Sequence, residues 1–154
     1  MILERFKVTD KIAVVTGGTR GIGLSIAHAL GEAGAKLVVT SRTDKFGGLE
    51  SLQKANYDVS FFEADITDKQ VPQKIIDYTL DKHGSIDILV NNAGVAQHGE
   101  MEEFNDDLLD KIMNINVDAL FRMCRSAITP MKKQGEGVIL NIGSISGLVS
   151  NIPQ

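Results

Sequence analysis

The sequence has few of the residues that form disulfides or metal centres, and it has no long hydrophobic run. Its one cysteine, Cys124, excludes an internal disulfide and favours a reducing compartment, so we expect a cytoplasmic protein. Its three histidines share no ligand spacing with a cysteine or an acidic cluster, so no metal site is predicted. No apolar stretch approaches the length that spans a bilayer, and the charged N-terminal residues do not read as a signal peptide.

An excess of positive charge is also absent. The chain carries 16 basic and 20 acidic residues, for a net charge of -4, which argues against a nucleic-acid partner. Its 154 residues, 43% of them hydrophobic, can bury the core of one domain at most. We therefore expect a single unit with no nucleic-acid partner and no membrane association.

A glycine-rich turn between a strand and a helix is the first segment that carries chemistry. Residues 12–16 (IAVVT) have the composition of a strand buried on both faces. The helix is predicted from one apolar stripe, which consists of Ile22, Ile26, Ala29, Leu30 and Ala33. Glycines in the intervening residues 17–23 let the backbone approach an anion, and the helix N-terminus attracts it. This order predicts a pyrophosphate site, and the alternative is a glycine-rich turn without a ligand.

The end of the next strand bears on the choice of dinucleotide. Residues 36–40 (KLVVT) predict this strand, and Ser41 and Arg42 follow it where NAD-binding units usually carry an acidic residue. Arg20, in the glycine-rich turn, can reach the same place, and arginine binds phosphate in a bidentate manner. These residues favour NADP(H) over NAD(H). Two alternatives remain: Asp44 as the acidic residue, although a turn is expected there, and Arg42 as a solvated loop residue.

Strands and helices continue to alternate along the chain. Three further strands are predicted at residues 59–63, 86–90 and 138–142. Residues 67–70 resemble a capping box that starts a helix, and residues 106–133 predict a long helix. The long helix has an apolar stripe of Leu109, Ile112, Asn116, Ala119, Leu120, Met123, Ala127 and Met131. This alternation predicts an α/β fold with a doubly wound parallel sheet of the Rossmann type, truncated after its fifth strand. Ligands are expected at the carboxyl edge of the sheet.

Asn116 interrupts the stripe of the long helix, and a buried asparagine needs partners. It is either a structural hydrogen-bonding residue or part of a site. Asn116 is one of five motifs whose order and spacing resemble the short-chain dehydrogenase/reductase family, and the resemblance covers the whole chain. The motifs are residues 16–23 (TGGTRGIG), Asp65, residues 91–94 (NNAG), Asn116, and residues 141–144 (NIGS).

The resemblance implies an oxidoreductase that acts on a small-molecule carbonyl/alcohol pair, such as a sugar acid, a polyol or a 3-oxoacyl compound, as a homo-oligomer (dimer or tetramer). By this resemblance, the cofactor phosphates meet Gly17, Thr19, Arg20 and Ile22 in the turn that Gly21 and Gly23 complete. Asp65 and Ile66 hold the adenine, and Asn92, Ala93 and Gly94 line the adenosine ribose side. Ser144 binds the substrate oxygen, and Asn116 supports a proton-relay water, so the resemblance favours the site over the structural role for Asn116.

The family also requires a Tyr-x-x-x-Lys motif for proton transfer, and its spacing places that tyrosine after Gln154. Tyr57 has Phe61 four residues later, and Tyr78 matches the bare pattern with Lys82 only far upstream of Ser144. We therefore expect residues 1–154 to be the N-terminal dinucleotide-binding part of a single Rossmann-type domain, without hydride-transfer activity alone. The alternatives are a nucleotide-binding module that has lost catalysis and an interaction fragment.

The isolated chain is expected to associate with itself. Its fifth strand would be an open sheet edge, which can pair with other chains. The stripe that includes Leu120, Met123, Ala127 and Met131 is expected to be partly exposed, because the family covers it with later elements.

Overall fold

A five-stranded parallel sheet forms the centre of the molecule. The computed structural model describes residues 2–97 and 99–147, so residues 148–154 of the predicted domain lie outside the described residues. The strands have the order β3-β2-β1-β4-β5. They are β1 (Ile12–Thr16), β2 (Lys36–Ser41), β3 (Val59–Glu63), β4 (Ile88–Asn91) and β5 (Val138–Asn141). All five predicted strands are confirmed within two residues, and each neighbouring pair is parallel.

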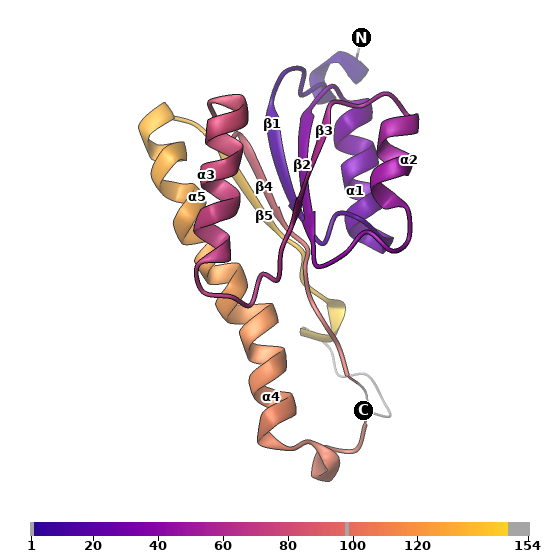
Figure 1. Cartoon of the computed structure of the whole chain (residues 1–154), viewed down its shortest axis with the longest axis vertical. Coiled ribbons are helices and arrows are strands. Elements are labelled where there is room, and N and C mark those ends of the chain that lie inside the picture. Colours follow the sequence, from indigo (N-terminus) through magenta and orange to yellow (C-terminus); the bar gives the residue numbers. More distant parts are fainter. Residues whose placement is uncertain (1, 98, 148–154) are drawn as a thin grey trace.

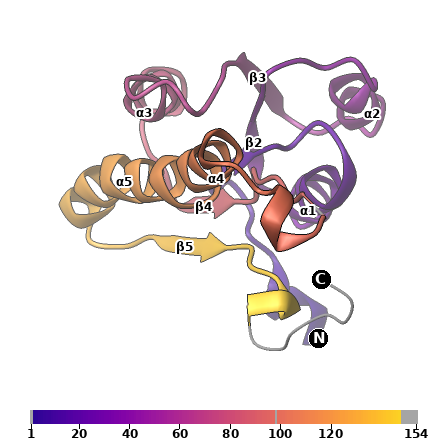
Figure 2. The same ribbon diagram turned by 90° about the horizontal axis from the view of Figure 1, so that it is seen from below.

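Helices cover both faces of the sheet, as Figures 1 and 2 show. One face carries α1 (Gly21–Glu32) and α2 (Gly48–Lys54). The other carries α3 (Val71–His83) and α5 (Leu120–Gln134), and α4 (Asp106–Met113) extends beyond the end of the sheet in Figure 1. Short 3-10 turns span Ile2–Phe6, Met101–Glu103 and Ile145–Gly147. The predicted doubly wound Rossmann-type fold is confirmed.

β1 explains why the core has two halves. All five of its residues are buried, because it lies between β2 and β4 and has helices over both faces. Successive side chains of a strand point to opposite faces. Val14 therefore packs with Ile75 and Met123 on the α3 and α5 side, and Ala13 and Val15 pack with residues of the α1 and α2 side.

The buried face of α1 agrees only in part with the predicted stripe. Ile26 and Leu30 of that stripe pack against the core, whereas Ile22 is 67% exposed. The buried residues of this helix are Gly23 and Ala27, whose small size lets the helix backbone approach the sheet closely. Ile22 lies instead at the mouth of a cavity described below.

The long helical region is interrupted. A π-helical segment, Asn114–Ala119 (η3), lies between α4 and α5. Met123, Ala127 and Met131 are buried in the core with α3, so the expectation that their stripe is partly exposed is wrong for these three residues. The half-exposed apolar side chains of this region face outward instead; they are Leu109, Met113, Val117, Phe121 and Ile128.

One local prediction is wrong, and one helix was not predicted. The capping box at residues 67–70 is wrong, because α3 begins at Val71 and its N-cap residue, Gln70, makes no side-chain capping bond. Helix α2 was not predicted, and the turn expected at Asp44 is confirmed: its Oδ1 accepts hydrogen bonds from the backbone of Gly48 (2.9 Å) and Leu49 (3.3 Å). These bonds cap α2 from outside the helix, because they satisfy two of its first N–H groups, while its N-cap residue, Gly47, makes no side-chain bond.

Candidate functional site

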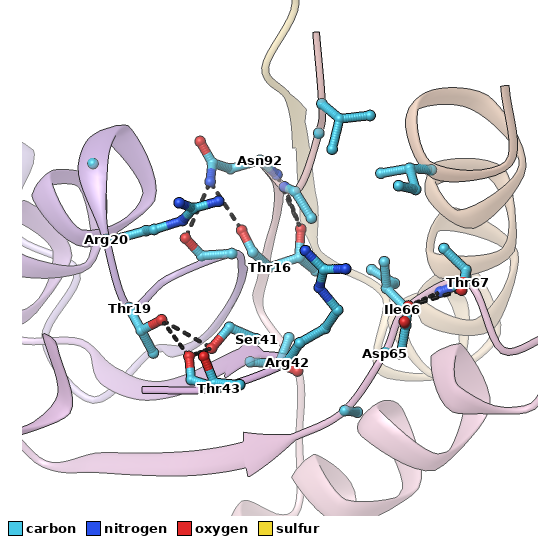
Figure 3. Close-up of a pocket in the computed structure, with 18 of the residues that line it drawn as sticks. Thr16, Thr19, Arg20, Ser41, Arg42, Thr43, Asp65, Ile66, Thr67 and Asn92 are labelled. Carbon is cyan, nitrogen blue, oxygen red and sulfur yellow. Dashed lines mark hydrogen bonds between the residues drawn. The ribbon is translucent and has the colours of Figure 1, made fainter. Parts of the chain in front are cut away.

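A cavity of about 570 Å³ opens at the carboxyl edge of the sheet, where the order of the strands reverses between β1 and β4 (Figure 3). Segments that follow β1, β2, β3 and β4 line it, together with Ile115 of the π-helical segment. Ligands of open α/β sheets bind at this place. The lining includes these predicted site residues: Gly17, Thr19, Arg20, Gly21, Ile22, Ser41, Arg42, Asp65, Ile66, Asn92, Ala93 and Gly94.

The glycine-rich turn needs its glycines for two different reasons. Gly17 has φ +65°, a conformation that glycine adopts without strain. Gly23 has no room for a side chain, because a Cβ atom there would collide with the Gly17 carbonyl oxygen and the Asn92 side chain. The turn is therefore held close to the end of β4.

The start of α1 is open to an anion. Its N-cap residue, Arg20, makes no side-chain capping bond, and Leu24 N donates to Arg20 O (3.2 Å) to begin the helical ladder. The preceding N–H groups of an α-helix have no helical acceptor. Those of Gly21, Ile22 and Gly23 therefore precede the ladder at the positive end of the helix dipole.

Thr16 joins the glycine-rich turn to the segment after β4. Its buried Oγ1 accepts hydrogen bonds from the backbone N–H groups of Asn92 and Ala93, both at 3.0 Å. In return, Asn92 Nδ2 donates to the carbonyl oxygens of Thr16 (3.0 Å) and Gly17 (3.3 Å), as Figure 3 shows. The Asn92 side chain thus fixes the turn, and Asn92, Ala93 and Gly94 line the cavity as predicted from the resemblance.

A second set of bonds joins the turn to the end of β2. The Thr19 hydroxyl is 2.8 Å from Ser41 Oγ, and both hydroxyls lie within hydrogen-bonding distance of the Thr43 carbonyl oxygen (3.3 and 2.8 Å). Thr19 is buried, so its side chain braces the turn and any contact with a phosphate would come from its backbone. Its predicted contact with the cofactor stays a prediction.

Arg20 and Arg42 both line the cavity. Figure 3 shows Arg20 entering from the glycine-rich turn and Arg42 from the end of β2. Both residues are exposed, and among the described residues neither donates a hydrogen bond or forms an ion pair. Two guanidinium groups in one cavity whose N–H donors have no acceptor among the described residues favour an anionic ligand group.

Asp65 and Ile66 line the wall that follows β3. Asp65 Oδ1 accepts hydrogen bonds from the Thr67 backbone (3.0 Å) and the Thr67 hydroxyl (2.8 Å). The Thr67 backbone bond chiefly holds the pKa of Asp65 below its ordinary value, the Thr67 hydroxyl and the Arg42 charge act the same way, and partial burial opposes them. Asp65 is therefore a stable carboxylate near neutral pH.

Asn116 lies in the π-helical segment and makes two bonds to one residue. Its Oδ1 accepts from Val95 N (2.9 Å), and its Nδ2 donates to Val95 O (2.8 Å). The side chain thus clamps the segment after β4 to the helix, which is the structural role weighed above. π-Helical segments are rare and frequently occur at functional sites. The predicted support of a proton relay stays a prediction.

Ser144 follows β5 and does not line the cavity. It is exposed, and its Oγ accepts a hydrogen bond from Ser146 N (3.1 Å). The ends of β4 and β5 are joined behind it by Asn91 Nδ2, which donates to Asn141 Oδ1 (2.9 Å). Cys124 lies beside Asn91, and partial burial raises the pKa of its thiol, so it is not an activated nucleophile.

Tyr78 and Lys82 lie in α3, away from the cavity. Lys82 Nζ is 3.5 Å from the Tyr78 hydroxyl, but the Tyr78 ring packs against Phe62 of β3. The Tyr78 ring therefore has a packing role, and that this match to the Tyr-x-x-x-Lys pattern arises by chance stays a prediction. Among the described residues, no three histidine, cysteine or acidic side chains gather as a metal site would require.

Sequence reasoning missed several lining residues: Thr43, Phe46, Thr67, Val95 and Ile115. Thr43, Thr67 and Val95 each directly follow a predicted site residue, and Ile115 directly precedes one, so their place in the chain was the signal that could have found them. Phe46 lies farther along the chain from the predicted residues and reaches the cavity through the fold. No helix in the described part of the chain is long and apolar enough to cross a membrane.

Comparisons with known proteins agree with this arrangement. The family model for short chain dehydrogenase matches residues 11–154. D-beta-hydroxybutyrate dehydrogenase of Rhizobium meliloti (strain 1021) is 39% identical over 150 residues, which is 92% of this chain and 56% of that protein. The NADP-dependent (R)-specific alcohol dehydrogenase of Lentilactobacillus kefiri is 36% identical over 147 residues, which is 94% of this chain and 58% of that protein.

A solved structure shares the fold. The crystal structure of a gluconate 5-dehydrogenase from Burkholderia cenocepacia J2315, in complex with NADP and tartrate, has a TM-score of 0.89 and 31% identity. The match covers 98% of this chain and 60% of that one, so the chain spans only part of the length of its relatives. From the family match over residues 11–154 and from these relatives, the chain belongs to the short-chain dehydrogenase/reductase family of oxidoreductases.

Proposed function

We propose that the cavity binds NADP(H) and that the chain serves an NADP(H)-dependent oxidoreductase acting on a carbonyl/alcohol pair. The observation that carries this proposal is that two guanidinium groups line the cavity, Arg20 from the glycine-rich turn and Arg42 from the end of β2, and that neither donates a hydrogen bond to a described residue. An NAD-specific site would place an acidic residue there to bind the ribose 2′-OH. The acid nearest in sequence, Asp44, is engaged in capping α2.

The residues of the turn fit the rest of the dinucleotide. The first N–H groups of α1 are available to an anion, because no capping side chain of the N-cap residue competes for them. The Gly17 carbonyl and the Asn92 side chain fill the space that a Cβ atom on Gly23 would need. This close packing fixes the backbone of the turn. Asp65 and Ile66, at the far wall, would hold the adenine, and Asn92, Ala93 and Gly94 would line the ribose side.

When bound, the nicotinamide group would exchange a hydride with the substrate carbon. Ser144 would bind the substrate oxygen: its Oγ accepts from Ser146 N, which leaves its own proton free to donate. Asn116 would act by fixing the π-helical segment against Val95. Neither hydroxyl nor amide activates proton transfer near neutral pH, so we propose that residues 1–154 alone turn over no ketone with NADPH. Steady oxidation of NADPH by the purified chain would contradict this.

The names of the relatives support the substrate class. They include a hydroxybutyrate dehydrogenase, an NADP-dependent alcohol dehydrogenase and a 3-oxoacyl-[acyl-carrier-protein] reductase. We therefore propose a small-molecule carbonyl or alcohol substrate, among sugar acids, polyols and 3-oxoacyl compounds. The single thiol supports a cytoplasmic location, and the half-exposed apolar side chains of α4 and α5 support a homo-oligomer of the parent enzyme.

The test of the cofactor proposal is calorimetric titration of the chain with NADP⁺ and NAD⁺. The wild type should bind NADP⁺ more tightly. Arg42→Asp should remove most of this preference, by about ten- to a hundredfold, because a charged hydrogen bond is lost and a like charge faces the phosphate. Arg125→Asp on α5 makes the same charge change and should leave the preference intact. Tighter binding of NAD⁺ by the wild type would overturn the proposal.

A further inference from the structure

Phe46 is an exposed aromatic residue whose position packing does not explain. Its side chain is 70% exposed, yet it lines the cavity beside the predicted phosphate-binding arginines. The Cζ atom of Arg20 lies over its ring, 5.7 Å from the ring centroid. A guanidinium within about 6 Å of an aromatic centroid is attracted by the negative face of the ring.

The loop that carries Phe46 is docked onto the glycine-rich turn. Gly48 packs directly on Thr19, so closely that a Cβ atom at position 48 would overlap the Thr19 carbonyl. On the other side of Phe46, the Thr43 carbonyl oxygen meets the Thr19 and Ser41 hydroxyls. Asp44 fixes the turn between them by capping α2. The ring is therefore held against the glycine-rich turn at both ends of its loop.

The contact between Phe46 and Arg20 uses the charge of the guanidinium and no oxygen acceptor. The N–H donors of Arg20 therefore remain available to an anion. Among the described residues, no oxygen accepts a hydrogen bond from Arg20. Phe46 thus limits the freedom of a long side chain without using the donors that an anion needs.

We propose that Phe46 is a positioning residue, which holds the Arg20 guanidinium ready for the 2′-phosphate of NADP(H) and so raises specificity for that cofactor. This inference rests on the proposed cofactor. A different role for Phe46, as an apolar wall for the adenosine, would affect NADP⁺ and NAD⁺ equally, because both carry the same adenosine. The two roles therefore differ in what they do to the ratio of the affinities.

The experiment measures the dissociation constants of the chain for NADP⁺ and NAD⁺ with substitutions at position 46. Phe46→Leu keeps an apolar side chain but removes the ring, and should weaken NADP⁺ binding by about two- to fivefold, as expected for an exposed cation–π contact, with NAD⁺ unchanged. Phe46→Tyr keeps the ring and should retain wild-type binding. Phe121→Leu is the matched control, since Phe121 is 61% exposed and Arg125 lies over its ring at 5.9 Å.

A double-mutant cycle with Arg20→Ala makes the test specific. When Arg20 is absent, Phe46→Leu should have no further effect on NADP⁺ binding, because the ring then has nothing to position. Equal weakening of both nucleotides, an effect that persists without Arg20, or no effect of Phe46→Leu would overturn the inference while leaving the proposed function intact. A wild type that binds both nucleotides equally would overturn the proposed function, and the inference with it.

Discussion

β1 and β5 are both short apolar strands, but the fold treats them in opposite ways. Every residue of β1 is buried, whereas Val138 and Leu140 of β5 are 61% and 49% exposed. β1 lies between two strands and under helices on both faces, and β5 pairs only with β4 among the described strands. The comparison teaches that an apolar run predicts a strand, while its neighbours decide how far the strand is buried.

The same difference separates the two candidate parts of the site. The turn after β1 is joined to β4 by Thr16 and Asn92 and to β2 by Thr19 and Ser41. Ser144 after β5 makes a local bond to Ser146. The proposed nucleotide end of the site is therefore held by long-range contacts, and the proposed substrate end by contacts close in sequence.

The largest expected difference between the two regions concerns glycine. Gly23→Ala should destabilise the fold by about 3 kcal/mol, because the new Cβ atom would overlap the Gly17 carbonyl in a rigid turn. Gly143→Ala, after β5, should change the stability by less than about 0.5 kcal/mol, because nothing lies within 4 Å of the added carbon. Urea unfolding measures both, and equal losses would break the comparison.

The next difference concerns the Thr16 hydroxyl. Thr16→Val keeps the shape but removes the acceptor of two backbone N–H groups, and should cost about 2 kcal/mol. Thr79→Val is the control: the Thr79 hydroxyl is equally buried but donates only to Ile75 O in its own helix. In thermal unfolding, the Thr16→Val variant should have a much lower melting temperature than the Thr79→Val variant. The reverse order would contradict the role given to Thr16.

A smaller effect tests burial of the strands directly. Val14→Thr in β1 places a hydroxyl in a fully buried position and should cost about 1–2 kcal/mol. Val138→Thr in β5 makes the same change at an exposed position and should be nearly neutral. If both substitutions cost the same in urea unfolding, β5 is covered in solution, for example by another copy of the chain.

The smallest effect is a pH dependence that arises on the α3 side of the sheet. The pKa of His83 is lowered from its ordinary value of 6.5, chiefly by burial of the side chain, and the negative charge of Asp58 acts in the opposite direction. The unfolded chain therefore binds a proton at a higher pH than the folded chain does, so stability is full above pH 6.5 and falls as the pH drops below it. His83→Gln should flatten the unfolding free energy between pH 7.5 and 5.5, about the range in which histidine titrates. An unchanged slope would contradict this.

The sequence predicted the parts of the molecule that local patterns determine. β1 and the turn at residues 17–23 follow from an apolar β-branched run and from glycines that no other residue can replace. The bonds that join the π-helical segment to the segment after β4 could not be predicted, because Asn116 and Val95 are 21 residues apart. The false capping box shows the same limit: Thr67 serves Asp65 and not the helix. Phe46 enters the site only through the docking of its loop.

The central claim is that the nucleotide end of the site is formed by this chain and prefers a 2′-phosphate. Nuclear magnetic resonance of the ¹⁵N-labelled chain, titrated in parallel with adenosine 2′,5′-bisphosphate and with adenosine 5′-monophosphate, tests it most directly, because the two compounds differ only in the 2′-phosphate. The bisphosphate should bind more tightly, and equal affinities would contradict the preference. The amide signals of Gly21, Ile22 and Gly23 should shift saturably and their hydrogen exchange should slow, while residues 138–147 stay unchanged. No saturable shift at these three amides, or a larger response at residues 138–147, would contradict the account.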